Sequence, residues 1–165
     1  MKPIARFEKV SFEQYAKDVG VSERTMDALK KDYDEIQLPT RATKLSAGYD
    51  FRLPIPAVFF GGEQAITIAT GIRCKMEPGW MLALFPKSGL SFRNGTRLIN
   101  TIAVIDADFY DSDNEGHIMV KMSAEKTLTL SRGDKFVQGI FIPCGLAEED
   151  EVTEVRNGGF GSTGK

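Results

Sequence analysis

Two aspartates follow a short apolar run in the middle of the chain. Asp106 comes directly after Ile102–Ile105, so the core would fix its backbone and leave its carboxylate at the edge of the core, a suitable place for a general base. Asp108 would share one face with Asp106 in an extended segment, because side chains alternate along such a segment. The alternative is a strand-ending turn rich in aspartate, or an adventitious divalent-ion site.

A second group of side chains could hold phosphate. Lys87, Ser88 and Gly89 follow an apolar run at a turn, where a cation, a hydroxyl and a glycine can expose backbone N–H groups to an anion. Such turns are common in proteins without this role. Gln138 interrupts the apolar run Phe136–Ile142, and its amide could meet a phosphate, a water or another chain. A solvated face of a strand is the alternative for Gln138.

The C-terminal segment combines flexibility with side chains suited to a nucleotide. Residues 156–165 include four glycines, each of which loses much backbone entropy on ordering, so the segment should be mobile without a ligand. Phe160 could lie on a base, and Arg156, Ser162 and Thr163 could hold phosphates. A frayed terminus without function is the alternative.

The composition is that of an ordinary globular domain. The chain has 165 residues, of which 42% are hydrophobic and 27% charged, which suffices for one domain with its own core. A net charge of −2 lacks the basic footprint of proteins that bind polymeric nucleic acid. We expect no membrane partner, because no apolar run approaches the length of a span. Cys74 and Cys144 lie far apart in the sequence and suggest reduced, buried thiols in a cytoplasmic protein.

Hydrophobic periodicity divides the chain into a short helical part and a long β part. An opening strand is expected over Ile4–Val10, a capping box at Ser11–Gln14, and a second helix from Ser22 to about Tyr33. From residue 36 onward, β-prone runs separated by turns predict an all-β barrel or jelly roll. These runs are Phe51–Phe60, Ala65–Cys74, Trp80–Phe85, Leu98–Val104, His117–Met122, Thr127–Leu130 and Lys135–Pro143.

Several further features are expected to serve the fold. The helices carry two apolar stripes, formed by Phe12, Tyr15 and Val19 and by Met26, Leu29 and Tyr33. Arg132–Asp134 is interpreted as a hairpin turn, and the single histidine, His117, as structural. We expect one domain over residues 1–165, with a helical insertion at about 11–33 and a C-terminal lid at about 156–165.

Five separated motifs, in order, resemble those of the trimeric dUTP diphosphatases (dUTPases) of bacterial or phage type. The motifs are Ala47–Asp50, Pro86–Leu90, Asn100–Asp108, Arg132–Gln138 and Arg156–Gly164. The resemblance covers residues 36–164 and implies a distorted β jelly roll that assembles as a homotrimer with shared active sites. It also implies hydrolysis of dUTP to dUMP and diphosphate with Mg²⁺.

The same resemblance implies roles for individual residues. Asp106 is similar to the general base that activates the water attacking the α-phosphorus. By the same resemblance, phosphate ligands are Lys87, Ser88, Gly89 and Gln138, the uracil reader is Asn100 with the backbone of Val104 and Ile105, and Phe109 packs on the deoxyribose. In the tail, Phe160 would stack on uracil while Arg156, Gly161, Ser162 and Thr163 belong to the closing lid. No direct protein ligand to Mg²⁺ is expected, although Asp50 could touch a metal-bound water.

The chain departs from the family pattern at several positions. Lys87 and Lys135 stand where arginine is usual, Ala103 replaces a glycine, and Phe109 replaces a tyrosine. These changes affect the expected rate and phosphate geometry more than the reaction class.

Two other functions remain open from the sequence. One is a dCTP deaminase of the same fold, in which Glu115 or Glu125 would act on the base. The other is a nucleotide-responsive regulatory module, in which the helical insertion would dock a partner protein.

Overall fold

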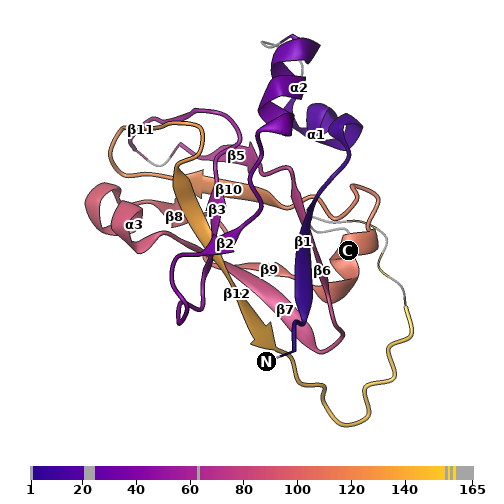
Figure 1. Ribbon diagram of the computed structural model, residues 1–165. Helices are drawn as coiled ribbons and strands as arrows, with labels where there is room; N and C mark the ends of the chain where they lie inside the picture. Colours follow the sequence, from indigo (N-terminus) through magenta and orange to yellow (C-terminus); the bar gives the residue numbers. More distant parts are fainter. Residues whose placement is uncertain (1, 21–24, 63, 155, 157, 159–165) are drawn as a thin grey trace.

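The computed structural model describes residues 2–20, 25–62, 64–154, 156 and 158. Twelve strands in this described part confirm the all-β class. They are β1 (Ala5–Lys9), β2 (Thr40–Arg41), β3 (Tyr49–Arg52), β4 (Ala57–Phe59), β5 (Ile66–Ala69), β6 (Ile72–Met76), β7 (Trp80–Pro86), β8 (Arg97–Leu98), β9 (Ala103–Ile105), β10 (Met119–Ser123), β11 (Leu128–Leu130) and β12 (Lys135–Pro143). Figure 1 shows the short strands crossing one another around a common interior.

The largest sheet has the order β2-β3-β12-β7-β9 and contains β12 at its centre. All its pairings are antiparallel, with Gln138 of β12 opposite Asp50 of β3 on one side and opposite Phe85 of β7 on the other. A three-stranded sheet, β5-β10-β8, and the pairs β1-β6 and β11-β4 complete the β structure.

The core lies between these sheets and draws on nearly every strand. Its largest fully buried side chains include Tyr15, Phe51, Phe59, Phe136, Leu82, Leu84 and Ile118. Phe7 of β1 contacts the rings of Tyr49, Phe51 and Phe141 at centroid distances of 5.4–5.8 Å. Aromatic contacts at these distances add to the burial of apolar area, and they fasten β1 to the five-stranded sheet.

Three of the expected strand runs are each broken into two strands. Phe51–Phe60 divides around Pro54 and Pro56, because proline lacks the N–H that a sheet interior needs. Ala65–Cys74 divides at Gly71, which has a φ of 72°, a conformation that glycine adopts without a steric penalty. Leu98–Val104 divides into β8, which pairs with β10, and β9, which pairs with β7 in the other sheet.

The N-terminal helices are α1 (Phe12–Val19) and α2 (Met26–Asp34). Ser11 is the N-cap of α1 and its side chain accepts a hydrogen bond from the backbone of Gln14, as the capping-box pattern predicts. The second helix begins at Met26 with Thr25 as its N-cap. The expected start at Ser22 was therefore wrong, with residues 21–24 outside the described part.

Both helices lie at one end of the molecule (Figure 1) and contact the β body through aromatic side chains. Tyr15 and Leu29 are buried, as expected from the apolar stripes, whereas Met26 is 48% exposed and does not join the core. Tyr33 contacts the rings of Phe12 and Tyr15 and donates a hydrogen bond to the Val10 carbonyl.

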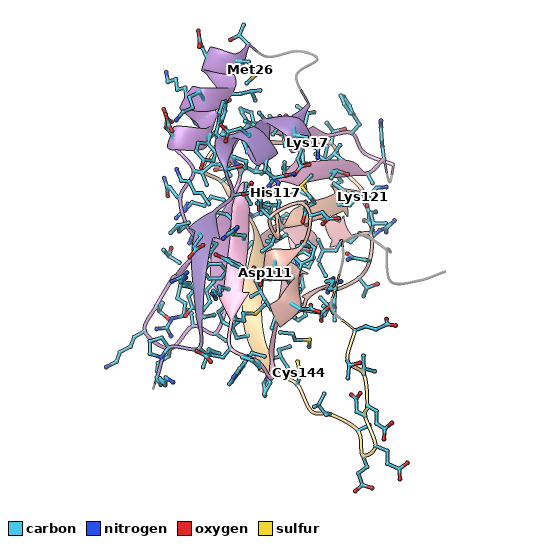
Figure 2. The ribbon with its side chains drawn as sticks, turned by 90° about the vertical axis from the view of Figure 1, so that its right-hand side faces the viewer. Lys17, Met26, Asp111, His117, Lys121 and Cys144 are labelled. Atoms are coloured by element: carbon cyan, nitrogen blue, oxygen red, sulfur yellow. The ribbon has the colours of Figure 1, made fainter. Side chains whose placement is uncertain are left out.

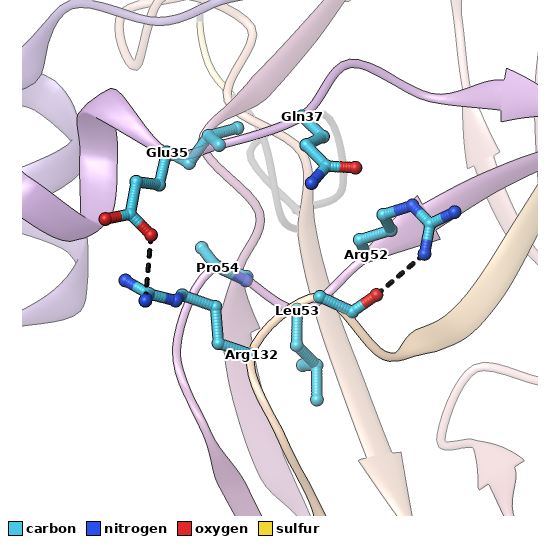
Figure 3. Close-up of a pocket in the computed structure, with 8 residues that line it drawn as sticks. Glu35, Gln37, Arg52, Leu53, Pro54 and Arg132 are labelled. Carbon is cyan, nitrogen blue, oxygen red and sulfur yellow. Dashed lines mark hydrogen bonds and ion pairs between the residues drawn. The ribbon is translucent and has the colours of Figure 1, made fainter.

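The Arg132–Asp134 turn holds the end of α2 (Figure 3). Arg132 forms ion pairs with Asp32 (Nη1 to Oδ1, 3.1 Å) and with Glu35 (Nη2 to Oε2, 2.8 Å). Arg52 donates a hydrogen bond to the Gly133 carbonyl at 2.8 Å, and a pocket of about 100 Å³ lies between these side chains. The turn is structural, as interpreted from the sequence, but it joins β11 to β12 in different sheets, so its expected role in a hairpin was wrong.

Two short helices were not expected from the sequence. α3 spans Ser88–Asn94, and the 3-10 helix η1 spans Ala107–Asp111. Asp106 is the N-cap residue of η1, so the expectation that Asp106 and Asp108 lie in one extended segment was wrong. The Asp-rich sequence favours a tight turn here, because aspartate is a preferred residue in turns and at the start of short helices.

The two cysteines differ in their environment. Cys74 is buried, as expected, and burial raises the pKa of its thiol to about 12. Cys144 is exposed where the chain leaves β12, so its expected burial was wrong (Figure 2). Among the described residues, the structure contains no helix with the length and apolar character needed to cross a membrane.

Candidate active site

A buried carboxylate with two ammonium partners forms the first cluster of charged residues. Asp50 Oδ1 lies 2.7 Å from Lys87 Nζ, and its Oδ2 lies 2.7 Å from Lys135 Nζ. The three residues come from the neighbouring strands β3 and β12 and from the first position after β7. Asp50 is 2% exposed, whereas the lysine side chains are 27% and 37% exposed. Two cations on one carboxylate leave this end of the sheet with a net positive charge, which suits an anion.

The charge of Asp50 depends on these lysines. Burial raises the pKa of the Asp50 carboxyl, but the hydrogen bonds from Lys135 and Lys87 outweigh it and hold the net pKa below its usual value. A depressed pKa contributes stability above the unfolded-state value, about 3.9. That contribution is lost as the pH falls through the lower, folded-state value.

Replacing Asp50 by asparagine should therefore destabilise the fold at neutral pH. The change leaves two ammonium groups without their shared counter-charge. Because water screens the partly exposed Lys135, we expect the free energy of unfolding to fall by about 1–3 kcal/mol, which is less than for a fully buried ion pair. Urea unfolding from pH 7 to pH 3 measures it, and the difference from the unchanged chain should shrink below about pH 4. Asp113→Asn, at an exposed position, is the control, and an equal loss in both variants would contradict the ion-pair cluster.

The predicted phosphate ligands lie at the same end of the sheet as the Asp50 cluster. Gln138 is opposite Asp50 in the sheet, and its amide packs on Gly48, where a Cβ would come within 2.6 Å of Gln138 Oε1. A side chain at residue 48 would displace that amide, which explains the glycine of the first motif. Ser88 and Gly89 open helix α3 directly after Lys87, and the first N–H groups of a helix have no acceptor within the helix.

A second cluster forms around the predicted base. Arg156 Nη1 lies 2.7 Å from Asp106 Oδ2 and 3.1 Å from Asp108 Oδ1, with its guanidinium 5.4 Å from the centroid of the Phe109 ring. The hydrogen bond from Arg156 to Asp106 is the main cause that raises the arginine pKa, so the guanidinium is a permanent cation. Asp106 is half exposed and Phe109 is buried, which places a carboxylate and an aromatic ring at one edge of the core.

The two clusters lie at opposite ends of β7. Ile105 is opposite Leu82, near the start of that strand, whereas Lys87 follows its last residue, Pro86. Five residues of extended chain separate Leu82 from Lys87, or about 16 Å at roughly 3.3 Å per residue. Within one chain, the predicted base and the predicted phosphate ligands therefore do not converge.

The predicted base-reading residues belong to β9 and to the turn that joins it to β8. Asn100 is exposed in this turn, and its carbonyl accepts a hydrogen bond from the Ile102 N–H at 2.6 Å. Together with Ala103 and strands β5 and β10, Asn100 lines a hollow of about 240 Å³. Val104 is exposed and Ile105 buried, with both backbones paired to β7.

Most of the predicted lid cannot be placed. Phe160, Gly161, Ser162 and Thr163 lie outside the described residues, and Arg156 is the one predicted lid side chain that the structure describes. The described tail, residues 144–154, leaves β12 and turns back alongside the molecule (Figure 1).

Sequence reasoning missed Lys135 as a partner of Asp50. The signal was an aspartate within the apolar run Tyr49–Phe51, since a buried charge there requires a cation. A bulge between Lys135 and Val137 shifts the register of β12 against β3, which no local pattern revealed. Within the described ranges, no three His, Cys, Asp or Glu side chains gather closely enough to hold a metal ion.

Comparison with known proteins settles the family. The family model for dUTPase matches residues 34–164. The chain belongs to the dUTPase family. It is 39% identical over 134 residues to the deoxyuridine 5'-triphosphate nucleotidohydrolase of Lactococcus lactis, a match that covers 78% of this chain and 89% of that one.

Solved dUTPase structures have the same fold. The crystal structure of dUTPase from Streptococcus mutans shares 30% identity and aligns with a TM-score of 0.65 over 86% of this chain and 98% of that one. A mutant dUTPase from phage phi11 of S. aureus, described with a structural Mg(II) ion, aligns with a TM-score of 0.59 at 19% identity over 72% of this chain and 90% of that one. The family assignment and the all-β jelly-roll-like fold class predicted from the sequence are thus confirmed.

Proposed function

We propose that this protein hydrolyses dUTP to dUMP and diphosphate. The observation that carries the proposal is the position of Asp106, an exposed carboxylate at the rim of the core beside a buried aromatic ring, in a chain of the dUTPase family. In the proposed reaction a water oxygen attacks the α-phosphorus while Asp106 accepts a proton from that water. The bond from the α-phosphorus to the oxygen that bridges it to the β-phosphorus breaks, and diphosphate leaves with that oxygen.

The remaining predicted residues position the substrate in this proposal. Asn100 and the backbone of Val104 and Ile105 read the uracil edge, while the buried Phe109 ring packs on the deoxyribose. Lys87, Ser88, Gly89 and Gln138 bind phosphate oxygens at the other end of β7. Hydrolysis of this kind depends mainly on positioning and charge stabilisation, which these residues supply without a covalent intermediate.

The proposal includes a homotrimer in which neighbouring subunits share each active site. Its support is the distance between the two clusters, about 16 Å along β7, since a general base must lie within hydrogen-bonding reach of the attacking water. One chain can supply the base and the sugar contact, and a second chain the phosphate ligands. The exposed apolar side chains of β9 and of the turn before it, Ile99, Ile102 and Val104, suit burial in such an assembly.

Arg156 has two partners in this proposal. In the structure it forms ion pairs with Asp106 and Asp108, and a triphosphate offers it stronger acceptors. Transfer of the guanidinium to phosphate would free Asp106 to accept a proton while Phe160, Ser162 and Thr163 close over the nucleotide with Gly161. The proposed lid thus couples substrate binding to release of the base.

Magnesium is proposed to arrive with the triphosphate. Mg²⁺ keeps several bound waters and needs few protein ligands when phosphates supply oxygen atoms. When bound, the ion would reduce the negative charge of the phosphates. The charged residues of the chain fit this arrangement, because both oxygens of Asp50 are already occupied by lysine ammonium groups. We therefore assign Asp50 to positioning Lys87 and Lys135, rather than to the metal or its water. A cytoplasmic location, consistent with two unpaired cysteines, completes the proposal.

Hydrolysis in ¹⁸O-labelled water tests the position of attack. Attack on the α-phosphorus places the label in dUMP and leaves diphosphate unlabelled, as mass spectrometry of the two products would show. Label in diphosphate would contradict attack at the α-phosphorus. Release of ammonia from dCTP, measured in parallel, would favour the deaminase alternative.

A further inference from the structure

The N-terminal helix α1 contacts the loop that follows the proposed catalytic residues. This loop, residues 112–117, joins η1 to β10. Glu115 accepts two hydrogen bonds from Ser11, one from the backbone N–H to Oε2 at 2.7 Å and one from the hydroxyl to Oε1 at 2.6 Å. Ser11 is also the N-cap of α1, so a single carboxylate fixes the start of the helix to the loop.

A second contact fixes the other end of α1 to the same loop. His117 is completely buried, and its Nε2 accepts a hydrogen bond from the Gly71 N–H at 2.8 Å. Its Nδ1 must therefore carry the proton that it shares with Asp18 Oδ2 at 2.5 Å. Gln14 donates a further hydrogen bond to the same Asp18 oxygen at 2.7 Å. Figure 2 shows His117 inside the molecule, below the helix that carries Lys17.

The loop in turn lies directly against η1. Ser112 donates hydrogen bonds from its N–H and its hydroxyl to the Phe109 carbonyl, at 3.1 and 2.7 Å. Gly116 packs so closely that a Cβ there would come within 2.7 Å of the Tyr110 Cα and 2.8 Å of the Phe109 oxygen. Glu115 itself has a φ of 57°, a left-handed conformation that costs energy for a residue with a side chain and needs fixed surroundings.

The back of η1 is held by the opening strand. Tyr110 donates a hydrogen bond to Glu8 Oε2 at 2.6 Å, and the Arg73 guanidinium lies 3.8 Å from the centroid of its ring. Arg73 also contacts Glu8 and the Glu115 carbonyl. Side chains from β1 and β6, together with the loop that α1 contacts, therefore pack against η1, the segment that carries Phe109 and follows Asp106.

Strand β1 and helix α1, which hold the loop 112–117 and η1, lie outside the range that the family model matches. The dUTPase family model begins at residue 34, so Glu8, Ser11 and Asp18 lie outside the range that it matches. Packing of the apolar core explains the burial of Tyr15, but it requires neither the paired hydrogen bonds at Glu115 nor the left-handed residue between Ser112 and His117.

We propose that α1 is a brace for the catalytic segment, with Ser11 and Glu115 as positioning residues for Asp106 and Phe109. This inference rests on the proposed function. The brace acts through the loop 112–117 and touches no substrate. A misplaced general base or sugar-packing ring lowers turnover and weakens selection against UTP, whereas a merely structural contact lowers thermal stability alone.

The test compares variants of the two hydrogen-bonding partners. We expect Ser11→Ala and Glu115→Gln each to lower kcat for dUTP about 5–50-fold with little change in KM, and to reduce the ratio of kcat/KM for dUTP over UTP. Ser11→Thr, which retains the hydroxyl, should restore most of both values. The double variant should lose little more than either single one, because both weaken the same contact. Lys17→Ala, at an exposed position on α1, is the control and should be unchanged.

The outcomes separate the brace from the proposed function. Suppose that the wild-type protein turns over dUTP and that both variants, assayed below their melting temperatures, match its kcat and its selectivity. That result would overturn the brace and leave the proposed function standing. A wild-type protein without dUTP turnover overturns the proposed function, and the brace with it. Should Ser11→Ala fail to fold, Glu115→Gln leaves the N-cap hydroxyl of α1 in place and alters the same contact, so full activity of that variant counts against the brace.

Discussion

Asp106→Asn should lower kcat for dUTP hydrolysis by about 10²–10⁴-fold, the usual contribution of a positioned general base. Asparagine keeps the shape of the side chain and can still accept a hydrogen bond from Arg156, so we expect dUTP to bind about as well as before. The loss should appear in kcat, because the carboxylate is required only when the water gives up its proton. Single-turnover hydrolysis with equilibrium dUTP binding measures both quantities.

Asp108→Asn is the matched control for Asp106→Asn. Asp108 lies two residues away, is similarly exposed and binds the same Arg156 nitrogen. It should lower kcat less than about 10-fold if its role is limited to the arginine contact. Equal losses in the two variants would contradict a special role for Asp106, and full activity of Asp106→Asn would exclude it as the base.

A chain truncated after residue 155 should remain folded and lose most of its activity. The last described strand, β12, ends at Pro143, so every sheet pairing among the described residues remains when residues 156–165 are removed. Loss of the arginine and of the proposed base-stacking ring should reduce kcat/KM by about 10²-fold or more, since both position the substrate and exclude water. Melting temperature and dUTP turnover of the same preparation measure the two effects.

A chain that ends at Gly158 separates the arginine from the rest of the lid. It retains Arg156 and lacks Phe160, Ser162 and Thr163, so activity close to that of the shorter truncation would assign the effect to the glycine-rich segment. Activity close to that of the full chain would assign it to Arg156. Full activity after truncation at residue 155 would contradict the lid altogether.

The strands were predictable because their signal is local. Alternating or continuous apolar runs between turn residues identified the β class, and Lys135–Pro143 coincides with β12. The helix cap at Ser11 depends on a hydroxyl that precedes a short apolar stripe, a signal that also lies within a few residues. Helix α3 gave no such signal, because its seven residues include Gly89 and have Lys87 as an N-cap without a side-chain hydrogen bond.

The arrangement of the site could not be predicted from residue types. Asp50 and Lys135 are brought together by the pairing of β3 with β12, and a bulge in β12 sets their register. The Asp50 and Asp106 clusters lie at opposite ends of β7 because of the register in which β9 pairs with β7, and no motif encodes that register. The contact between Ser11 and Glu115 joins residues 104 positions apart, and both were assigned from sequence to separate features. Motifs identified the site residues, whereas sheet register determined which of them meet.

Diphosphate release from dUTP, compared with UTP, dTTP and dCTP under the same magnesium concentration, tests the central proposal most directly. We expect rapid release from dUTP and at least about 10²-fold lower kcat/KM for the other three, since Asn100 and the β9 backbone must read the uracil edge and Phe109 must exclude a 2′-hydroxyl. A folded protein that releases no diphosphate from dUTP, or that hydrolyses all four nucleotides equally well, would contradict the proposal.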